Sequence, residues 1–265
     1  MSARDQRHIQ SVQRALQLLT LFTPHLTEHG SRRSVWTVSD LARASGLHKS
    51  VVARLMATMA AQGFVIQDPL TRAYCVGPQA FAVGASYAPH AVLNTVARPI
   101  MEDLTGQCGH ASYLGVPAGR HYIIIVAVES RHSLRVTIDV GESRHMHTGA
   151  IGKVLLAGLT DDAIRALLGA DPLPRLTPQT ITSVATLLHE VHEARRVGVA
   201  FNRGEAVLGA GSVAVAITDR SARAVAGLGI VYPQQMVTEA EIHLLAGLVA
   251  RAGAAISTQL GAIDA

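Results

Sequence analysis

The chain has 265 residues, which is long for one compact domain and comfortable for two. Nearly half of the residues are hydrophobic and 16% are charged, so a sizeable core is available and a disordered chain is excluded. Two cysteines exclude a disulfide framework, and the sequence shows neither a signal-like start nor an apolar run of membrane-spanning length. We therefore expect a cytoplasmic protein without a membrane partner.

The positive charge is concentrated in the first quarter of the chain. Residues 1–75 contain nine Lys or Arg and four Asp or Glu, a net charge of +5, against +4 for the whole chain. A basic N-terminal part of this kind is typical of a module that binds phosphate groups, such as those of nucleic acids. A solvated basic face without a partner is the other interpretation of this charge.

Residues 9–22 are predicted to form the first helix. Apolar side chains recur there at helical spacing, Arg14 and Gln17 fall on the opposite side, and Pro24 follows. A polar and basic loop is expected over residues 25–34. The stripe that we expect this helix to bury consists of Ile9, Val12, Leu16, Leu19 and Phe22.

Residues 38–62 are predicted to form two helices joined by a tight turn at Gly46. Ser39 is placed to cap the first helix, over residues 40–44, and the second helix begins near His48. The pattern is typical of a helix-turn-helix, whose second helix lies in the DNA major groove, although an αα-hairpin in a helical domain has the same pattern. One face of the second helix carries Lys49, Ser50 and Arg54, and a face predicted to be buried carries Leu55, Met56 and Met59.

A β-hairpin is predicted directly after these helices. Residues 64–67 and 72–76 have strand-like patterns on either side of a turn at residues 68–71, and residues 35–38 form a further short β-prone stretch. A hairpin in this place is typical of a winged helix-turn-helix. Arg72 at its tip is placed to reach backbone phosphates or the minor groove.

Three runs of residues resemble the IclR family of bacterial transcriptional regulators, namely residues 11–16 (SVQRAL), 47–55 (LHKSVVARL) and 74–77 (YCVG). The Lys, Ser and Arg of the second run match the family's recognition helix, whereas His48, Val51 and Ala53 depart from its usual Pro, Thr and His. The resemblance implies binding of double-stranded operator DNA. Our candidate DNA contacts are Thr37, Ser39, His48, Lys49, Ser50, Val51, Arg54 and Arg72.

The rest of the chain is predicted to form a linker helix and an α/β domain. The linker helix spans residues 78–95, with Phe81 and Leu93 on its packing face. A capping box at Thr238 and Glu241 opens the last helix, and Thr177 is expected to cap another long helix. Other helices are predicted over residues 96–106 and 161–168, and strands over residues 111–116, 122–129, 134–140, 212–218 and 224–231, with a loop at 201–206.

This order of elements predicts an α+β fold. It comprises a winged helix-turn-helix domain over residues 1–77, the linker helix, and an effector-binding domain over residues 96–265. The last domain is expected to be an α/β sensor domain of the GAF-like kind with a mainly antiparallel sheet. The resemblance implies the same architecture.

A junction between a strand and a helix is predicted at residues 145–157 (HMHTGAIGKVLLA), which resemble the corresponding junction of the family. Free backbone N–H groups at such a helix start can hold a small carboxylate, although the glycines there can also serve only to make a tight turn. The resemblance implies that a small organic acid binds at this junction as an effector. The residues that it implies for this site are Gly149, Ala150, Ile151, Asn202, Ser212, Gly227 and Gly229.

Four of these positions depart from the family pattern. Asn202 stands in place of an acid, Ser212 in place of a cysteine, and Gly227 and Gly229 in place of serines. Glycine removes hydroxyl donors and frees volume. We therefore predict a larger and flatter effector, such as an aromatic acid.

Motifs for catalysis, cofactors and metals are not convincing in this sequence. The glycines near Lys153 lack the remaining residues of a phosphate-binding loop, and Gly209 and Gly211 precede a strand where a dinucleotide fingerprint requires a helix. We expect no catalytic residues, no cofactor and no enzyme activity. We also expect no metal site, because the histidines that could be grouped as ligands are scattered and lack a nearby cysteine: His145, His147, His189 and His192.

The predicted function is therefore that of a DNA-binding transcriptional regulator whose operator binding responds to a small carboxylate. Such a regulator is expected to act as a homodimer or homotetramer on a partly palindromic operator. The alternative is a small-molecule-binding or catalytic α/β protein that uses its winged helix for protein contacts.

Overall fold

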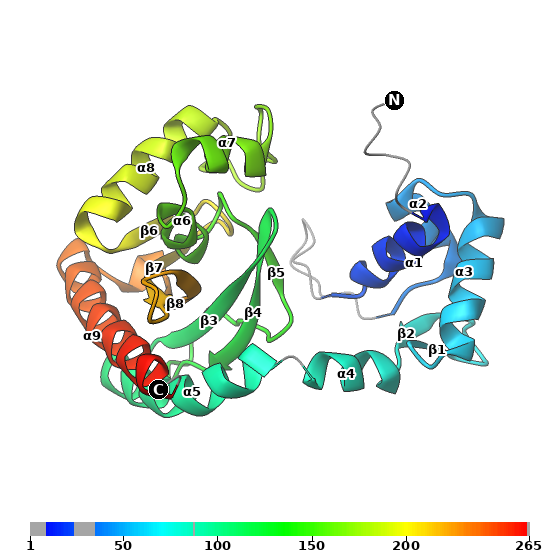
Figure 1. The fold of residues 1–265 in the computed structure, drawn as a ribbon, viewed down its shortest axis with the longest axis horizontal. Helices are drawn as coiled ribbons and strands as arrows, with labels where there is room; N and C mark the ends of the chain where they lie inside the picture. Colours follow the sequence, from blue (N-terminus) through cyan, green and yellow to red (C-terminus); the bar gives the residue numbers. More distant parts are fainter. Residues whose placement is uncertain (1–8, 24–34, 87, 264–265) are drawn as a thin grey trace. The chain divides into compact units, whose positions relative to one another are not determined.

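A computed structural model of the protein describes residues 9–23, 35–86 and 88–263 (Figure 1). The chain divides into two compact units, Met1–Ala88 and Pro89–Ala265, each with its own hydrophobic core. The loop predicted over residues 25–34 lies outside the described residues.

The first unit is a winged helix-turn-helix, as predicted. Gly46, with a φ of +70°, ends the second helix in the left-handed conformation that glycine adopts most readily and so makes the tight turn into the third. Two short antiparallel strands follow, with Val65 opposite Val76. The elements are α1 (Gln10–Thr20), α2 (Val38–Ser45), α3 (Lys49–Ala61), β1 (Val65–Gln67), β2 (Tyr74–Val76) and α4 (Pro78–Ala85).

The stretch at residues 35–38 is not a strand of its own. Trp36 forms a single antiparallel bridge with Tyr74, through backbone hydrogen bonds of 2.8 and 2.9 Å in the two directions. Val38 already belongs to α2. The wing is therefore linked to the entrance of the helix-turn-helix.

The buried face of α1 differs from the predicted one. Leu18 and Phe22 are buried, but Ile9, Val12 and Leu16 are 70%, 51% and 57% exposed. The helix has two apolar stripes at helical spacing, so the sequence pattern alone does not show which of them faces the core. The stripe that packs on α2 and α3 contains Ala15, Leu18, Leu19 and Phe22.

The N-terminus of α2 is capped by Thr37 and not by Ser39 as predicted. The Thr37 hydroxyl accepts a hydrogen bond from the Asp40 backbone N–H, and the Asp40 carboxylate accepts one from the Thr37 backbone N–H. This reciprocal arrangement is a capping box. Ser39 is already the second residue of the helix.

Replacing Thr37 with alanine is expected to lower the free energy of unfolding of the first unit by about 1 kcal/mol, because a donor at the helix start loses its partner. Urea unfolding followed by the fluorescence of Trp36, the single tryptophan of the chain, measures this change. Ser39→Ala is the matched control and should change the free energy by less than about 0.5 kcal/mol. Equal losses in both variants would contradict the assignment of the cap.

The predicted linker helix is divided into two helices. Helix α4 ends at Ala85, and α5 (Ala88–Cys108) begins three residues later. Pro89 lacks the N–H that a continuous helix needs, so it suits the first turn of a new helix. Leu93 is buried as predicted, but Phe81 on α4 is 77% exposed.

The second unit is built around a six-stranded antiparallel sheet, which confirms the predicted fold class. The strand order is β5-β4-β3-β8-β7-β6, and every neighbouring pair is antiparallel. The strands are β3 (Ala111–Ala118), β4 (His121–Val128), β5 (Ser143–His145), β6 (Ala200–Arg203), β7 (Ala210–Thr218) and β8 (Ala224–Pro233).

Helices cover both faces of this sheet (Figure 1). One core lies between the sheet and helices α5 and α9 (Glu239–Ile263), which opens with the predicted capping box of Thr238 and Glu241. The other core lies between the sheet and helices α6 (Ala150–Ala157), α7 (Asp161–Leu168) and α8 (Val184–Val197). The candidate effector residues lie on this second side.

Three predicted elements of the second unit are wrong. Residues 134–140 are not a strand, although Val136 and Ile138 pack inward, and the strand that pairs with β4 is β5. The predicted loop at residues 201–206 begins inside the edge strand β6. Thr177 does not cap a helix, because it lies in a turn where its hydroxyl donates to the Gly204 carbonyl at 2.7 Å. The long helix α8 begins only at Val184.

One helix of the described residues, α9, is long and apolar enough to span a membrane by length and composition. Its apolar side chains Ile242, Leu245 and Val249 are buried in the core against the sheet. The apolar character of one face of α9 is therefore explained by packing in the core.

Candidate DNA-binding surface and effector site

Helix α3 presents a polar face that is free of the core. Val52, Met56 and Met59 are buried, and they hold the helix against the rest of the first unit. Ser50 and Arg54 are exposed one turn apart on the opposite side. The exposed residues of α3 are Lys49, Ser50, Arg54, Ala57, Thr58 and Ala61.

His48 forms the N-cap of α3. Its Nδ1 accepts a hydrogen bond from the Ser50 backbone N–H at 3.4 Å and lies 2.9 Å from the Ser50 hydroxyl. The histidine that departs from the family pattern therefore serves as a helix cap. Val51, the next departure, is half-buried and lies on the side of α3 between the core and the exposed face.

The remaining candidate DNA contacts lie at the start of α2 and on the wing. Thr37 is exposed, but its hydroxyl is engaged with Asp40, and Ser39 is half-buried. Arg72 is exposed at the hairpin turn with a φ of +57°, where the Asp68 carboxylate accepts hydrogen bonds from two backbone N–H groups of the turn. The wing tip thus holds its arginine on an ordered turn.

The candidate effector residues converge on one side of the sheet. Asn202 on β6 is paired with Ser212 on β7, and both are buried. Helix α6 packs directly on this side of the sheet. A Cβ added at Gly227 on β8 would lie 2.8 Å from the Ile151 Cγ2 of α6. The N-terminus of α6 at Gly149 has an extended backbone and no side-chain cap from the described residues.

The prediction that glycines free volume at this site is wrong. An added Cβ at Gly229 would lie 2.9 Å from the Tyr113 ring, and one at Gly149 would lie 2.3 Å from the Tyr122 hydroxyl. The space beside these glycines is filled by two tyrosine side chains and by Ile151. The glycines here accommodate side chains of the protein itself.

A buried polar cluster, which the sequence pattern did not reveal, adjoins these residues. We call it the Arg144 cluster, and it consists of Tyr113, Tyr122, Glu142, Arg144 and Ser212. The Arg144 Nε donates to the Glu142 carboxylate at 2.9 Å, and both side chains are at least nine-tenths buried. The only sign of this pair in the sequence is that Glu142 and Arg144 are two positions apart, which places both side chains on the same side of an extended chain.

Electrostatics link the members of the cluster. Burial raises the pKa values of both tyrosines, and the Arg144 guanidinium opposes this rise in part. Burial also opposes a charge on Arg144, but its neighbours Tyr122 and Glu142 raise its pKa overall. The cluster therefore contains neutral tyrosines and a cationic arginine beside an acid.

Lys153 on α6 is a second buried basic residue, and the sequence alone indicated no role for it. Its Nζ lies 2.8 Å from both carboxylate oxygens of Glu205 and donates to the Phe201 carbonyl at 2.9 Å and to Glu190 at 3.3 Å. Burial raises the pKa of Glu205, and the lysine opposes that rise. These bonds tie α6 to α8, to the edge strand and to the loop that follows it.

Within the described part of the chain, the histidines that were considered as ligands are not gathered at a metal site. His121, His145 and His147 lie in a row with ring centroids 4.5 and 5.3 Å apart, while His192 on α8 pairs with Asp161. Among the described residues, no group of three or more His, Cys, Asp or Glu side chains is arranged to hold a metal ion.

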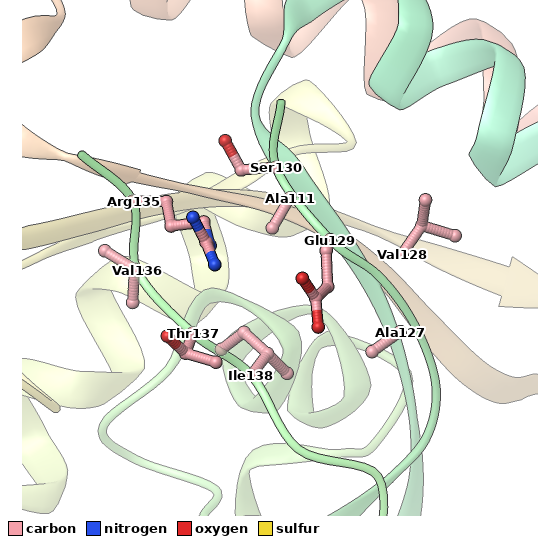
Figure 2. Close-up of a pocket in the computed structure, with 9 residues that line it drawn as sticks. All are labelled: Ala111, Ala127, Val128, Glu129, Ser130, Arg135, Val136, Thr137 and Ile138. Atoms are coloured by element: carbon pink, nitrogen blue, oxygen red, sulfur yellow. The ribbon is translucent and has the colours of Figure 1, made fainter. Parts of the chain in front are cut away.

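A small pocket lies elsewhere on the second unit, between the end of β4 and the irregular segment that follows it (Figure 2). Glu129 and Arg135 are its charged residues, and its volume of about 220 Å³ includes the open mouth. None of the candidate effector residues lines it; the lining residues are Ala111, Ala127, Val128, Glu129, Ser130, Arg135, Val136, Thr137 and Ile138.

Both units match domains of one known protein family. Residues 11–69 match the IclR helix-turn-helix domain, and residues 85–258 match the C-terminal domain of bacterial transcriptional regulators of the IclR type. The chain belongs to the IclR family. It is therefore a DNA-binding transcriptional regulator and not an enzyme, as predicted.

Relatives in this family match over nearly their whole length. The HTH-type transcriptional regulator XynR of Escherichia coli is 29% identical, and the match covers 96% of this chain and 98% of XynR. The HTH-type transcriptional repressor AllR of Escherichia coli is 28% identical over 97% of this chain and 92% of AllR. The IclR relatives thus have both units in the same order.

Solved structures share the fold. An IclR-type regulator from Silicibacter sp. TM1040 is 29% identical, with a TM-score of 0.79 over 95% of this chain and 96% of that one. An IclR homologue from Microbacterium hydrocarbonoxydans, solved with 4-hydroxybenzoate, has a TM-score of 0.75 at 22% identity over 95% of this chain and 99% of that one.

Proposed function

We propose that this IclR-family regulator binds double-stranded operator DNA through α3 and its wing, and that a small carboxylate bound in the second unit modulates this binding. The observation that carries the proposal is the exposed polar face of α3, with Ser50 and Arg54 one turn apart opposite a buried apolar face. Such a helix suits the major groove, and Arg72 on the wing suits backbone phosphates. The proposed DNA contacts are Thr37, Ser39, His48, Lys49, Ser50, Val51, Arg54 and Arg72.

The proposed effector site is the junction at α6. Backbone N–H groups at an uncapped helix start favour an anion, and the buried polar side chains of Asn202 on β6 and Ser212 on β7 lie on the same side of the sheet. The proposed contacts are Gly149, Ala150, Ile151, Asn202, Ser212, Gly227 and Gly229. We assign DNA binding to residues 1–77, effector binding to residues 96–265 and the connection to residues 78–95.

The effector and the DNA are expected to influence each other reciprocally. If the effector changes DNA affinity, DNA must change effector affinity by the same factor, because both bias one equilibrium. A coupling of about 1–3 kcal/mol corresponds to a change of roughly 5–150-fold in operator affinity. A homodimer or homotetramer would place two recognition helices one or more helical turns apart on DNA.

The salt dependence of DNA binding tests this function. The affinity of the full chain for duplex DNA from its own upstream region should fall steeply with salt, with a log–log slope of about −0.9 per phosphate contacted. A scrambled duplex of the same length serves as the control, and it should bind more weakly at each salt concentration. A slope near zero, or equal affinity for both duplexes, would overturn the proposal.

A further inference from the structure

The Arg144 cluster lies against the N-terminus of α6. The Tyr122 hydroxyl is next to Gly149, at the helix start, since a Cβ on that glycine would lie 2.3 Å from it. Tyr122 is also the cross-strand neighbour of Arg144. Tyr113 faces Tyr122 and Ser212, so the five side chains form a continuous buried chain from β7 to β5.

Several polar atoms of this cluster are buried without a hydrogen-bond partner among the described residues. They include a carboxylate oxygen of Glu142, Oε2, and the Nη2 of Arg144, which lies 2.9 Å from the other carboxylate oxygen but outside hydrogen-bond geometry. The Tyr122 hydroxyl, which lies beside Arg144, and the Ser212 hydroxyl, which lies beside Tyr113, are the other two. Leaving such buried groups without a hydrogen-bond partner destabilises the protein, and the effect is larger for charged groups.

The unpaired atoms define the chemistry of a ligand. Arg144 can only donate, and the helix start also presents donors, so these groups require an acceptor such as a carboxylate. A carboxylate oxygen can only accept, so the free Oε2 of Glu142 requires a donor on the same ligand. A hydroxyl group supplies that donor without adding a second charge.

We propose that the effector site binds a small aliphatic hydroxycarboxylate, whose carboxylate is held by Arg144 and the start of α6 and whose hydroxyl donates to Glu142. This inference rests on the proposed effector function and makes Arg144 and Glu142 its specificity-determining residues. It replaces the aromatic acid predicted from the sequence. A flat ring has no room where Tyr113 and Ile151 fill the space beside Gly229 and Gly227.

Isothermal titration of the full chain with glycerate, propionate and benzoate tests the proposal. Glycerate and propionate share a three-carbon skeleton and differ only in hydroxyl groups. We expect glycerate to bind at least about tenfold more tightly than propionate, because propionate leaves the Glu142 acceptor unpaired. Equal binding of the two acids, tighter binding of benzoate, or no binding of any of the three would overturn it.

A double variant separates recognition from folding. Glu142→Leu with Arg144→Met removes the buried pair together, a change that proteins often tolerate, and circular dichroism should show a native fold. The preference for glycerate should then fall to less than about twofold, whereas the matched change Glu193→Leu with Arg196→Met, on an exposed pair of α8, should retain it. A folded double variant that keeps the preference would contradict the assignment.

DNA binding by the same preparation distinguishes this inference from the function on which it rests. A steep salt dependence together with indifference to glycerate would overturn the ligand class alone. Loss of salt-dependent DNA binding in the unmodified chain would instead overturn the proposed function.

Discussion

Replacing Arg54 with alanine is expected to weaken binding to the operator by about 5–150-fold while weakening binding to a scrambled duplex much less. Arg54 is exposed on α3, the proposed recognition helix, whose side chains would contact base edges in the major groove. Loss of one good contact between arginine and a base costs about 1–3 kcal/mol. Gel-shift titrations with both duplexes at one salt concentration measure the effect.

Arg43→Ala is the matched control for this prediction. Arg43 lies near the end of α2 with its side chain 79% exposed, and it pairs only weakly with Asp40 at 3.4 Å. Its loss should lower the affinity for both duplexes to a similar and small extent. Unchanged operator affinity in Arg54→Ala would show that α3 is not the recognition helix. An equal loss on both duplexes would show that Arg54 contacts a phosphate.

Replacing Lys153 with alanine is expected to lower the free energy of unfolding of the second unit by about 3–5 kcal/mol, because it leaves a buried acid without its counter-charge. The Lys153 side chain is fully buried, and the Glu205 side chain is only 9% exposed. The Phe201 carbonyl on the edge strand loses its donor as well. Urea unfolding followed by far-ultraviolet circular dichroism measures the change.

Two comparisons make this result specific. Arg196→Ala breaks an exposed pair on α8 and should cost less than about 1 kcal/mol. Lys153→Met combined with Glu205→Leu should be more stable than Lys153→Ala, because no unpaired charge remains. The fluorescence of Trp36, in the first unit, should show an unchanged transition in all of these variants. A double variant as unstable as the single one would show that packing, and not charge, is the cause.

The helix-turn-helix and its wing were predictable because their signals are local. Gly46 makes the turn, and the buried residues of α3 recur within one helix, so a short window of sequence contains the whole pattern. The buried face of α1 was not predictable in this way. Leu16 and Leu18 both belong to apolar stripes, and the choice between them depends on where α2 and α3 lie.

Long strands were likewise predictable from local sequence, whereas short strands depended on their neighbours in the sheet. The strands β7 and β8 have nine and ten residues and contain long apolar runs, so they were found from sequence. The strands β5 and β6, with three and four residues, exist because a neighbour offers free backbone groups. Pairing with β4 selected residues 143–145 over the more strand-like residues 134–140.

By itself the sequence determined the family, the order of the two units and the candidate DNA-reading residues, because these depend on residue types at short spacings. Only the tertiary structure decided the character of the proposed effector site. The volume beside Gly229 is filled by Tyr113, from a strand more than 100 positions away, and Arg144 becomes a buried cation only when β5 pairs with β4. Such contacts join distant segments, and no local pattern of residues records them.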